Sequence, residues 1–214
     1  MIGLALKLLR DELSEYIFHN KRPDDSITQD DVILHNIALM EGDAAADLSN
    51  KIVITLVNSE EESTLKNNTN AVRTLNGIRY VEPAVFLNLY ILISATLGQD
   101  LQDAYEFALH RLSLIVQFFQ AKKSFTVKNS PFSSISTDVN IPQEIKDELR
   151  LNVELYTLTF EQINHLWGSL GGKQVPFAMY KIRLVKVQEN SGQDAPLIET
   201  IKTVETIINA ECDE

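Results

Sequence analysis

The sequence predicts an α+β domain in which a sheet carries an N-terminal helix and a long central helix. Apolar residues recur every three to four positions in residues 2–19 and again in 101–120, as in amphipathic helices. In residues 84–96 apolar residues occupy every second position, which is the period of a strand. Hydrophobic residues make up 44% of the 214 residues, so a packed core is expected and wholesale disorder is excluded.

The first helix, at residues 2–19, is expected to lie on the sheet because its apolar stripe is wide. The stripe consists of Ile2, Leu4, Leu6, Leu8, Leu9, Leu13 and Ile17. Charged residues and Pro23 end the helix. A short strand is expected at 32–39. A stronger strand is expected at 51–58, where apolar residues face both ways, as in the centre of a sheet.

A long polar loop is predicted for residues 59–82, and loops of this length are often functional. The strand at 84–96 follows. One of its faces is wholly apolar, whereas the other, which includes Asn88, is mixed. Asp100 can then cap the long helix at 101–120.

The C-terminal half predicts shorter elements. In order, they are a polar loop at 128–143, a half-exposed strand at 149–155, a short helix at 161–170, a strand at 178–188 and a turn or linker at 190–196. Residues 197–210 have helical spacing, yet eight of the fourteen are Ile, Val or Thr, which favours a strand. Helix and strand both stay open there. We expect one domain at 1–189 and an arm or tail at 190–214.

Charge and cysteine content exclude several classes of function. Acidic residues outnumber basic ones 30 to 19, a formal net charge of −11, which disfavours binding to nucleic acid or to an anionic membrane surface. Residues 189–214 hold seven acids and one base, or −6 of the −11. We predict that this acidic arm meets a basic surface on a neighbouring subunit or on a partner protein. Cys212 is the single cysteine, so neither an internal disulfide nor a cysteine metal cage is expected.

No targeting or membrane segment is expected. The N-terminus is amphipathic and no small-residue cleavage site follows it. The longest apolar run, residues 84–97, has 14 residues and is too short to span a bilayer. We therefore expect synthesis and assembly in the cytoplasm, without direct membrane insertion.

No catalytic or cofactor-binding pattern stands out, so we expect neither an enzyme nor a cofactor. The four histidines are scattered and lack the spacing of metal ligands. Residues 168–173 have the wrong spacing for a phosphate-binding loop. The glutamate run at 60–62 could bind a divalent cation, as a metal-dependent hydrolase would require. Such a run is more often a solvated strand end, and we expect no metal there.

Four ordered segments resemble the cap or tail-terminator family of phage-tail-like contractile injection systems. That group includes the anti-feeding prophage and virulence-cassette particles. The segments are LVNSEEE at 56–62 with LKN at 65–67, PAVFLNLY at 83–90, YxxALxxLS at 105–113 with FFQ at 118–120, and FEQINHLWG at 160–168 leading through LGGK at 170–173 to Pro176 and YKxR at 180–183. The resemblance covers nearly the whole chain up to about residue 188.

The resemblance implies a structural protein. Such caps form a six-fold ring on the end of the inner tube and sheath opposite the baseplate, where they stop polymerisation. The implied fold is tail-terminator-like, a mixed, largely antiparallel sheet of four to six strands with helices packed on it. The implied partners are further copies of this chain in a homohexameric ring, together with the sheath and inner-tube proteins. An assembly chaperone or cargo adaptor of the same machine is the alternative. Whether the particle is released or membrane-anchored stays open.

The candidate partner-interface residues lie in these segments. They are Glu60, Glu61, Glu62, Asn88, Asn164, His165 and Trp167. Asn88, Asn164 and His165 also suit a simpler role, in which they satisfy backbone groups at the ends of elements. Trp167 suits the core but is amphipathic enough to anchor an interface.

Overall fold

A computed structural model describes residues 1–40, 47–63, 71–74, 77–81, 83–98, 103–171, 173–188 and 192–195. The chain divides into two compact units. Unit 1 comprises residues 1–66 and 84–187, and unit 2 comprises residues 67–83 and 188–214. Each unit is described by itself. The division into 1–189 and 190–214 expected from the sequence stays a prediction.

Unit 1 contains four α-helices and six strands among its described residues. The helices are α1 (Ile2–Asn20), α2 (Ala104–Ala121), α3 (Gln143–Glu148) and α4 (Phe160–Ser169), with 3-10 turns η1 (Gln29–Asp31), η2 (Ile37–Met40) and η5 (Val127–Asn129). The strands are β1 (Val32–Leu34), β2 (Ile52–Glu61), β5 (Val85–Ala95), β6 (Ser124–Thr126), β7 (Arg150–Leu155) and β8 (Phe177–Val187).

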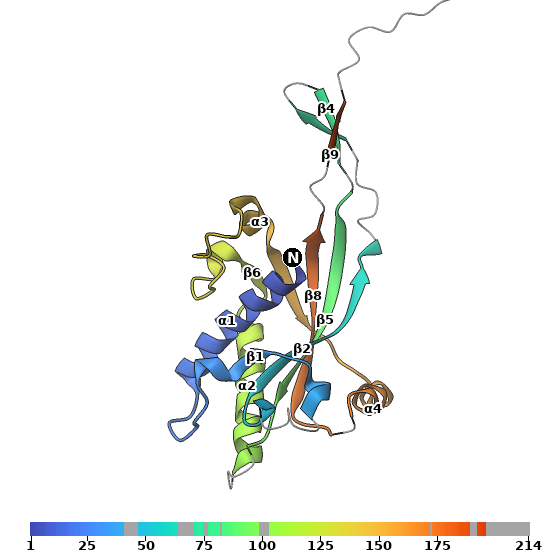
Figure 1. The fold of residues 1–214 in the computed structure, drawn as a ribbon. Helices are drawn as coiled ribbons and strands as arrows, with labels where there is room; N and C mark the ends of the chain where they lie inside the picture. The colour runs from blue at the N-terminus through green and yellow to red at the C-terminus, as the bar shows by residue number, and fades with distance from the viewer. Residues whose placement is uncertain are drawn as a thin grey trace, which may run out of the picture. The chain divides into compact units, whose positions relative to one another are not determined.

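The strands of unit 1 form one mixed sheet in the order β1-β2-β5-β8-β7-β6. β1 and β2 are parallel, and every other neighbouring pair is antiparallel. Helices α1 and α2 lie on one face of this sheet and α4 on the other (Figure 1). The predicted fold class, a mixed and largely antiparallel sheet with an N-terminal helix and a long central helix, is confirmed.

Strand β5 separates two cores because its side chains alternate between the faces of the sheet. Leu89, Ile91 and Ile93 lie in the larger core, against α1 and α2. Tyr90 and Leu92 lie in the smaller core, against α4 and η2. The two faces predicted for residues 84–96 are therefore both internal over the second half of β5, which explains why this strand is so apolar.

Helix α2 buries only one side of its apolar surface. The buried residues are Ala108, Arg111, Leu114, Ile115, Phe118 and Phe119. Tyr105, Leu109 and Val116 share the predicted helical period, yet they are 60%, 41% and 41% exposed. Unit 1 thus presents apolar side chains along the outer side of α2.

Two buried polar contacts fasten loops to the helices. Asp25, in the turn after α1, receives two hydrogen bonds from the Arg111 guanidinium, and both side chains are almost fully buried. Glu12 of α1 accepts hydrogen bonds from Lys122 Nζ (2.9 Å) and from the backbone N–H of Phe132 (2.9 Å). These contacts hold the 21–28 turn and the 130–134 loop in place.

Helix α4 has a defined start and a defined end. The Thr159 hydroxyl accepts a hydrogen bond from Gln162 N–H, and the Gln162 side chain accepts one from Thr159 N–H, which is a capping box. Gly171 follows with φ of 96°, the left-handed conformation that favours glycine at a helix C-terminus. The predicted short helix and its glycine stop are confirmed.

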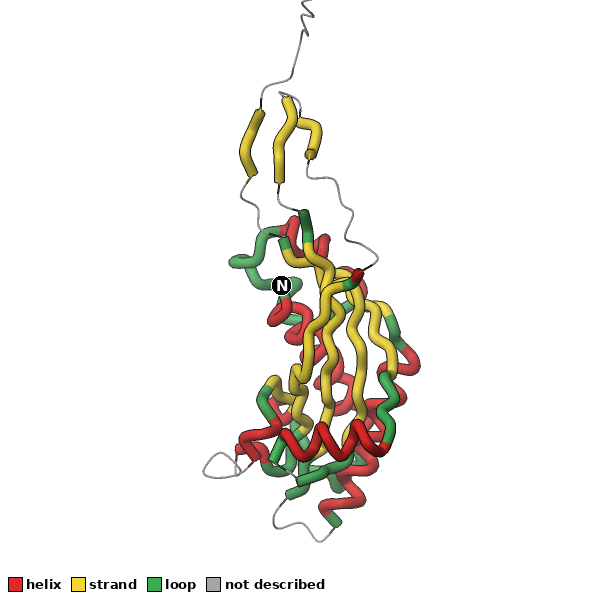
Figure 2. Tube along the Cα trace, turned by 90° about the vertical axis from the view of Figure 1, so that its right-hand side faces the viewer, coloured by secondary structure: helices red, strands yellow, loops and turns green. Residues whose placement is uncertain are grey.

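Unit 2 contains three strands among its described residues: β3 (Ala71–Thr74), β4 (Gly77–Val81) and β9 (Gly192–Ala195). They form an antiparallel sheet in the order β3-β4-β9. Along the chain β3 follows β2, β4 precedes β5 and β9 follows β8. The small sheet therefore repeats the neighbour order β2-β5-β8 of the large one (Figure 2).

Three sequence expectations about loops are wrong. Residues 59–82 are not one loop, because β2 continues through Glu61 and two short strands follow. Residues 190–196 are not only a linker, because β9 lies within them and pairs with β4. The strand expected at 32–39 ends at Leu34, since the Asn36 side chain accepts a hydrogen bond from Ala38 N–H and turns the chain into η2.

The remaining elements agree with the expected ones to within a few residues, with two omissions. The three-residue strand β6 and the six-residue helix α3 were not predicted from the sequence. Residues 99–102, at the expected start of the long helix, lie outside the described residues, as do residues 197–210.

Candidate assembly interface

The predicted glutamate run is divided between the two faces of the sheet. A β-bulge between Leu56 and Asn58 reverses the alternation of β2. Beyond it Glu60 lies opposite Asn88, on the face that carries α4, and Glu61 lies opposite Leu87, on the other face. Of the three predicted glutamates, only Glu60 and Glu62 come together with Asn88.

Asn88 connects β5 to the end of β2. Its side chain Nδ2 donates a hydrogen bond to Glu62 Oε2 (2.8 Å), and the backbone N–H of Glu62 donates to Phe86 O (2.8 Å). Asn88 is only 4% exposed, and its Oδ1 finds no hydrogen-bond partner among the described residues. A buried acceptor without a donor is costly, so an ordered water is the expected partner of this oxygen, which burial keeps from direct contact with another protein.

Tyr90 is central to the site. From the sequence it was expected only on one face of a strand. Its hydroxyl donates a hydrogen bond to Glu60 Oε2 (3.0 Å), and the Lys181 ammonium lies 5.4 Å from the centre of its ring. Burial and the bond to Glu60 raise the pKa of the Tyr90 hydroxyl above its ordinary value. The ring also stacks edge-on against Tyr156 at 5.0 Å. Tyr90 thus joins the polar part of this face to the smaller core.

Strands β7 and β8 extend the same face with further charges. Arg183 Nε lies 3.1 Å from Glu154 Oε2, and these side chains are about half exposed. The register pairs Glu154 with Lys181, and Lys181 with Tyr90, so all of them share one face. We call Glu60, Asn88, Tyr90, Glu154, Lys181 and Arg183 the polar face. In Figure 2 α4 crosses the lower part of the strands, and the described strands above it are uncovered.

The candidate residues of α4 have different positions. Asn164 and His165 are exposed, and His165 Nε2 lies 3.9 Å from Glu161 Oε1 of the same helix. Trp167 is 4% exposed and stacks on Phe177 at 5.3 Å, so it belongs to the smaller core. Its Nε1 has no hydrogen-bond partner among the described residues. Asn164 and His165 are therefore available for contacts, whereas Trp167 supports the helix from beneath.

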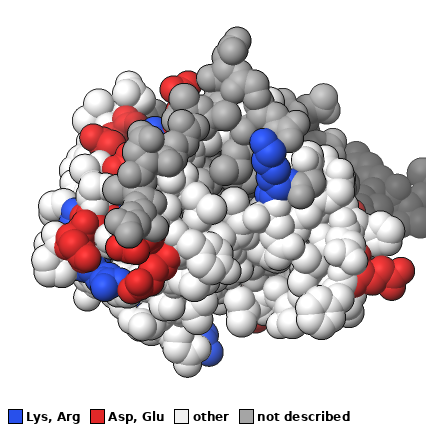
Figure 3. All heavy atoms as spheres, turned by 90° about the horizontal axis from the view of Figure 1, so that it is seen from below, with Lys and Arg blue, Asp and Glu red and all other residues white. Residues whose placement is uncertain are grey.

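The surface at the lower end of unit 1 carries charges of both signs. Acidic side chains gather at one side of it with basic ones beside them (Figure 3). Arg22 illustrates the pairing, because it contacts Asp24 at 3.6 Å and Glu106 at 2.5 Å. Such an arrangement does not form the basic patch that nucleic acid requires.

Two kinds of feature are absent from the described residues. No group of three His, Cys, Asp or Glu side chains is arranged to hold a metal ion there. None of the described helices combines the length and the apolar character needed to cross a bilayer. What the described surface offers is strand edges, apolar side chains on α2, and the polar face, all of which are suited to contacts with other proteins.

Two solved structures share the fold. One is the sheath/tube terminator of PVC, an extracellular contractile injection system, in the extended state. It is 16% identical in sequence, with a TM-score of 0.56, and the match covers 100% of this chain and 65% of that chain. The other is the anti-feeding prophage cap, a tube-terminating cap; it is 10% identical, with a TM-score of 0.54 over 92% of this chain and 60% of that chain. The chain thus spans less than two thirds of either protein.

The search of curated proteins found no match. The model of the Pvc16 N-terminal domain family, in contrast, matches residues 6–200, which include almost all of unit 1 and every described strand of unit 2. The resemblance inferred from the four sequence segments is confirmed by this match and by the shared fold. The chain belongs to the Pvc16 N-terminal domain family.

Proposed function

We propose that this protein caps the distal end of the inner tube and sheath of a contractile injection particle, where it ends polymerisation and stabilises the particle. The observation that carries the proposal is the shared fold, which extends over 100% and 92% of this chain in two proteins described as terminators or caps. A non-enzymatic, structural role goes with it. The sheath and inner-tube proteins are the proposed partners.

We infer further that the working form is a homohexameric ring. A closed ring needs two different, complementary surfaces on each subunit. The polar face supplies one candidate surface, because it presents Glu60 and Glu154 beside Lys181 and Arg183 without a described helix above it. The acidic arm at 190–214 is proposed to reach a basic surface of a neighbour or of the sheath.

Deleting the gene tests the capping role. Particles from the deletion strain should have sheaths of uncontrolled length, or should fall apart, when they are viewed by electron microscopy. Normal-length, stable particles would refute the proposal. Mass spectrometry of intact particles separates the cap from an assembly chaperone or cargo adaptor, since a cap stays in the particle at a few copies and a chaperone does not.

A charge reversal tests the ring interface. Arg183→Glu should weaken ring formation, because it replaces the cation paired with Glu154 by an acid and makes the polar face more negative, as measured by analytical ultracentrifugation of the purified chain. Lys128→Glu is the matched control, since Lys128 is 83% exposed and lies on η5, away from the polar face. Equal loss of rings in both variants would indicate a general charge effect and would argue against the polar face.

A further inference from the structure

A hollow of about 580 Å³ lies along β1, at the edge of the sheet of unit 1. Residues of α1, η1, β1 and the 130–134 loop line it. The size falls within the range of about 300–1,000 Å³ that is typical of binding clefts. We call this hollow, together with its neighbour described next, the β1 groove.

The second part of the β1 groove is an almost wholly apolar hollow of about 310 Å³. Tyr16, Phe118 and Phe132 supply its aromatic walls, and it meets the first hollow at Glu15 and Phe132. Phe132 is 60% exposed, yet Glu12 holds its backbone N–H at 2.9 Å. The groove therefore has a fixed wall with an aromatic side chain open to solvent, which is where an apolar side chain of a partner would gain the most.

Strand β1 presents free backbone groups to the groove. Among the described strands it is the last of the sheet, and β2 is its one partner there. His35 N–H donates to Ile54 O (3.1 Å), so His35 directs its backbone groups toward β2. In a parallel pair every second residue of a strand does so, and the residues between them point the opposite way. The N–H and C=O of Leu34 and the C=O of Val32 therefore point away from β2. An extended segment of another chain could pair with these groups, which is the geometry of strand addition.

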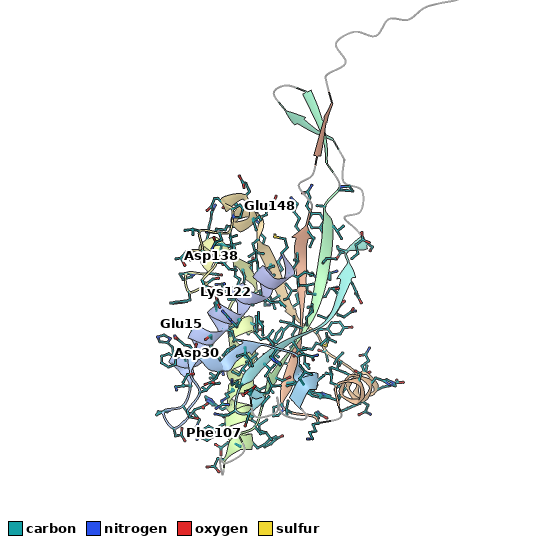
Figure 4. The ribbon with its side chains drawn as sticks, viewed as in Figure 1. Glu15, Asp30, Phe107, Lys122, Asp138 and Glu148 are labelled. Carbon is teal, nitrogen blue, oxygen red and sulfur yellow. The ribbon has the colours of Figure 1, made fainter. Side chains whose placement is uncertain are left out.

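The charge of the groove favours a basic segment. Among the described residues, its lining contains the acids Asp11, Glu12, Glu15 and Asp30 and one permanent cation, Arg10, which is paired with Asp11. Glu15 and Asp30 both lie on the outer side of α1 and η1 (Figure 4). The chain's own residues 189–214, with seven acids and one base, would be repelled there. A second copy's arm is thus a poor occupant.

We propose that the β1 groove binds an extended segment of a different protein of the particle, one that carries a lysine or arginine beside an apolar side chain. The segment adds a strand to β1, its basic side chain faces Asp30, and its apolar side chain enters the hollow lined by Phe132. This inference rests on the proposed function only in that the partner is part of the same particle.

Photo-crosslinking in assembled particles tests the proposal. Phe132 is replaced by p-benzoyl-phenylalanine in the full chain, which keeps an aromatic group at that position. Tyr105 of α2, also 60% exposed, receives the same residue in a control strain. After irradiation, mass spectrometry should find the Phe132 position joined to a Lys- or Arg-containing segment of another particle protein, and the Tyr105 position should not be joined to that segment.

Two further changes, each combined with the probe at Phe132, make the outcome specific. Leu34→Pro removes the N–H that points away from β2, and an edge strand tolerates this change. Asp30→Lys reverses the charge. Each should lower the cross-link yield at least about fivefold, whereas Glu144→Lys on α3 should not.

A cross-link to a second copy of this chain, to an acidic segment, or to no protein would overturn the proposal. So would a yield that both changes leave intact. Electron microscopy of the same particles shows separately whether the sheath length is normal, so a failure of this inference is distinguishable from a failure of the capping role.

Discussion

Breaking the ion pair between Asp25 and Arg111 should destabilise the protein far more than breaking the exposed pair that joins the same two segments. Arg111 Nε donates to Asp25 Oδ2 (2.9 Å), and the two side chains are 0% and 1% exposed. Asp25 also accepts a hydrogen bond from Ile27 N–H (3.0 Å). Arg111 Nη1 lies 3.3 Å from the carbonyl oxygen of Asn50. The pair therefore connects the turn after α1, helix α2 and the start of β2.

The expected magnitude follows from the burial. Asp25→Asn leaves the guanidinium of Arg111 buried without its counter-charge, and Arg111→Met leaves the carboxylate of Asp25 in the same situation. Removing one partner of a buried pair costs roughly 3–5 kcal/mol of unfolding free energy. Combining both changes should cost much less than the sum, because no uncompensated charge is left.

Equilibrium unfolding in guanidinium chloride measures these costs. Glu106→Gln is the control, because it breaks the pair with Arg22, whose members are 65% and 37% exposed. Exposed pairs contribute about 0–1 kcal/mol. The reasoning is refuted if Asp25→Asn costs no more than this control, or if the double variant costs as much as the two single changes together.

The same pair predicts a pH dependence. Burial by itself raises the pKa of Asp25, but the hydrogen bonds from Arg111 and from Ile27 N–H outweigh it and hold the pKa below the ordinary value. The stabilisation is therefore present above the unfolded-state pKa of about 3.9 and is lost as the pH falls through the lower folded-state value. Asp25→Asn should show a weaker loss of stability in that acidic window.

Three further changes have predictable effects. Gly171→Ala should cost about 1–2 kcal/mol in chemical unfolding, because φ of 96° is unfavourable for a residue with a Cβ; an unchanged unfolding midpoint would contradict this. Trp167→Ala should lower the free energy of unfolding by roughly 3–5 kcal/mol. Trp167→Phe should lower it much less, since Nε1 has no hydrogen-bond partner among the described residues. Equal losses in the two variants would show that the indole N–H matters. Glu12→Ala should cost about 1–3 kcal/mol and should speed hydrogen exchange in residues 130–134, while exchange in α4 stays unchanged.

The main sheet and its helices could be predicted because strong periodicity and burial coincide there. Residues 84–96 alternate between a wholly apolar face and a mixed one, and both faces are covered over the second half of β5. The long helix could likewise be predicted from its period. Its exposed side could not, because Tyr105, Leu109 and Val116 have the same apolar character as its buried residues.

Of the small strands, β9 could not be predicted because nothing local distinguishes it, whereas β3 and β4 have a local hairpin signal, Asn76-Gly77, which the prediction of one loop at 59–82 did not use. β3 and β4 contain four and five residues, and β9 contains Gly, Gln and Asp. β3 pairs with β4 locally, with Thr74 opposite Gly77, but β9 joins this sheet through a segment that is more than a hundred residues away in the sequence, as in Arg79 opposite Asp194. Pairing of that kind leaves no periodic pattern in a single sequence.

The candidate site could be predicted only in part, and a single bulge explains why. Without the extra residue at Val57, Glu60 would share the face of Ile54 and would lie under α1 and α2 instead of beside Tyr90. Glu60 and Asn88 were predicted from their sequence segments. That they lie beside Tyr90 and Lys181 could not be predicted. Register shifts of this kind depend on the neighbouring strands.

The three chain connections between unit 1 and unit 2 have a mechanical consequence. The chain crosses between the units near residues 66, 83 and 187, and the strands that lead to these crossings are β2, β5 and β8, three neighbours at the centre of one sheet. Tension applied to unit 2 would therefore reach unit 1 through three neighbouring strands of one sheet rather than through one. A terminal arm joined by one strand could be unzipped one hydrogen bond at a time.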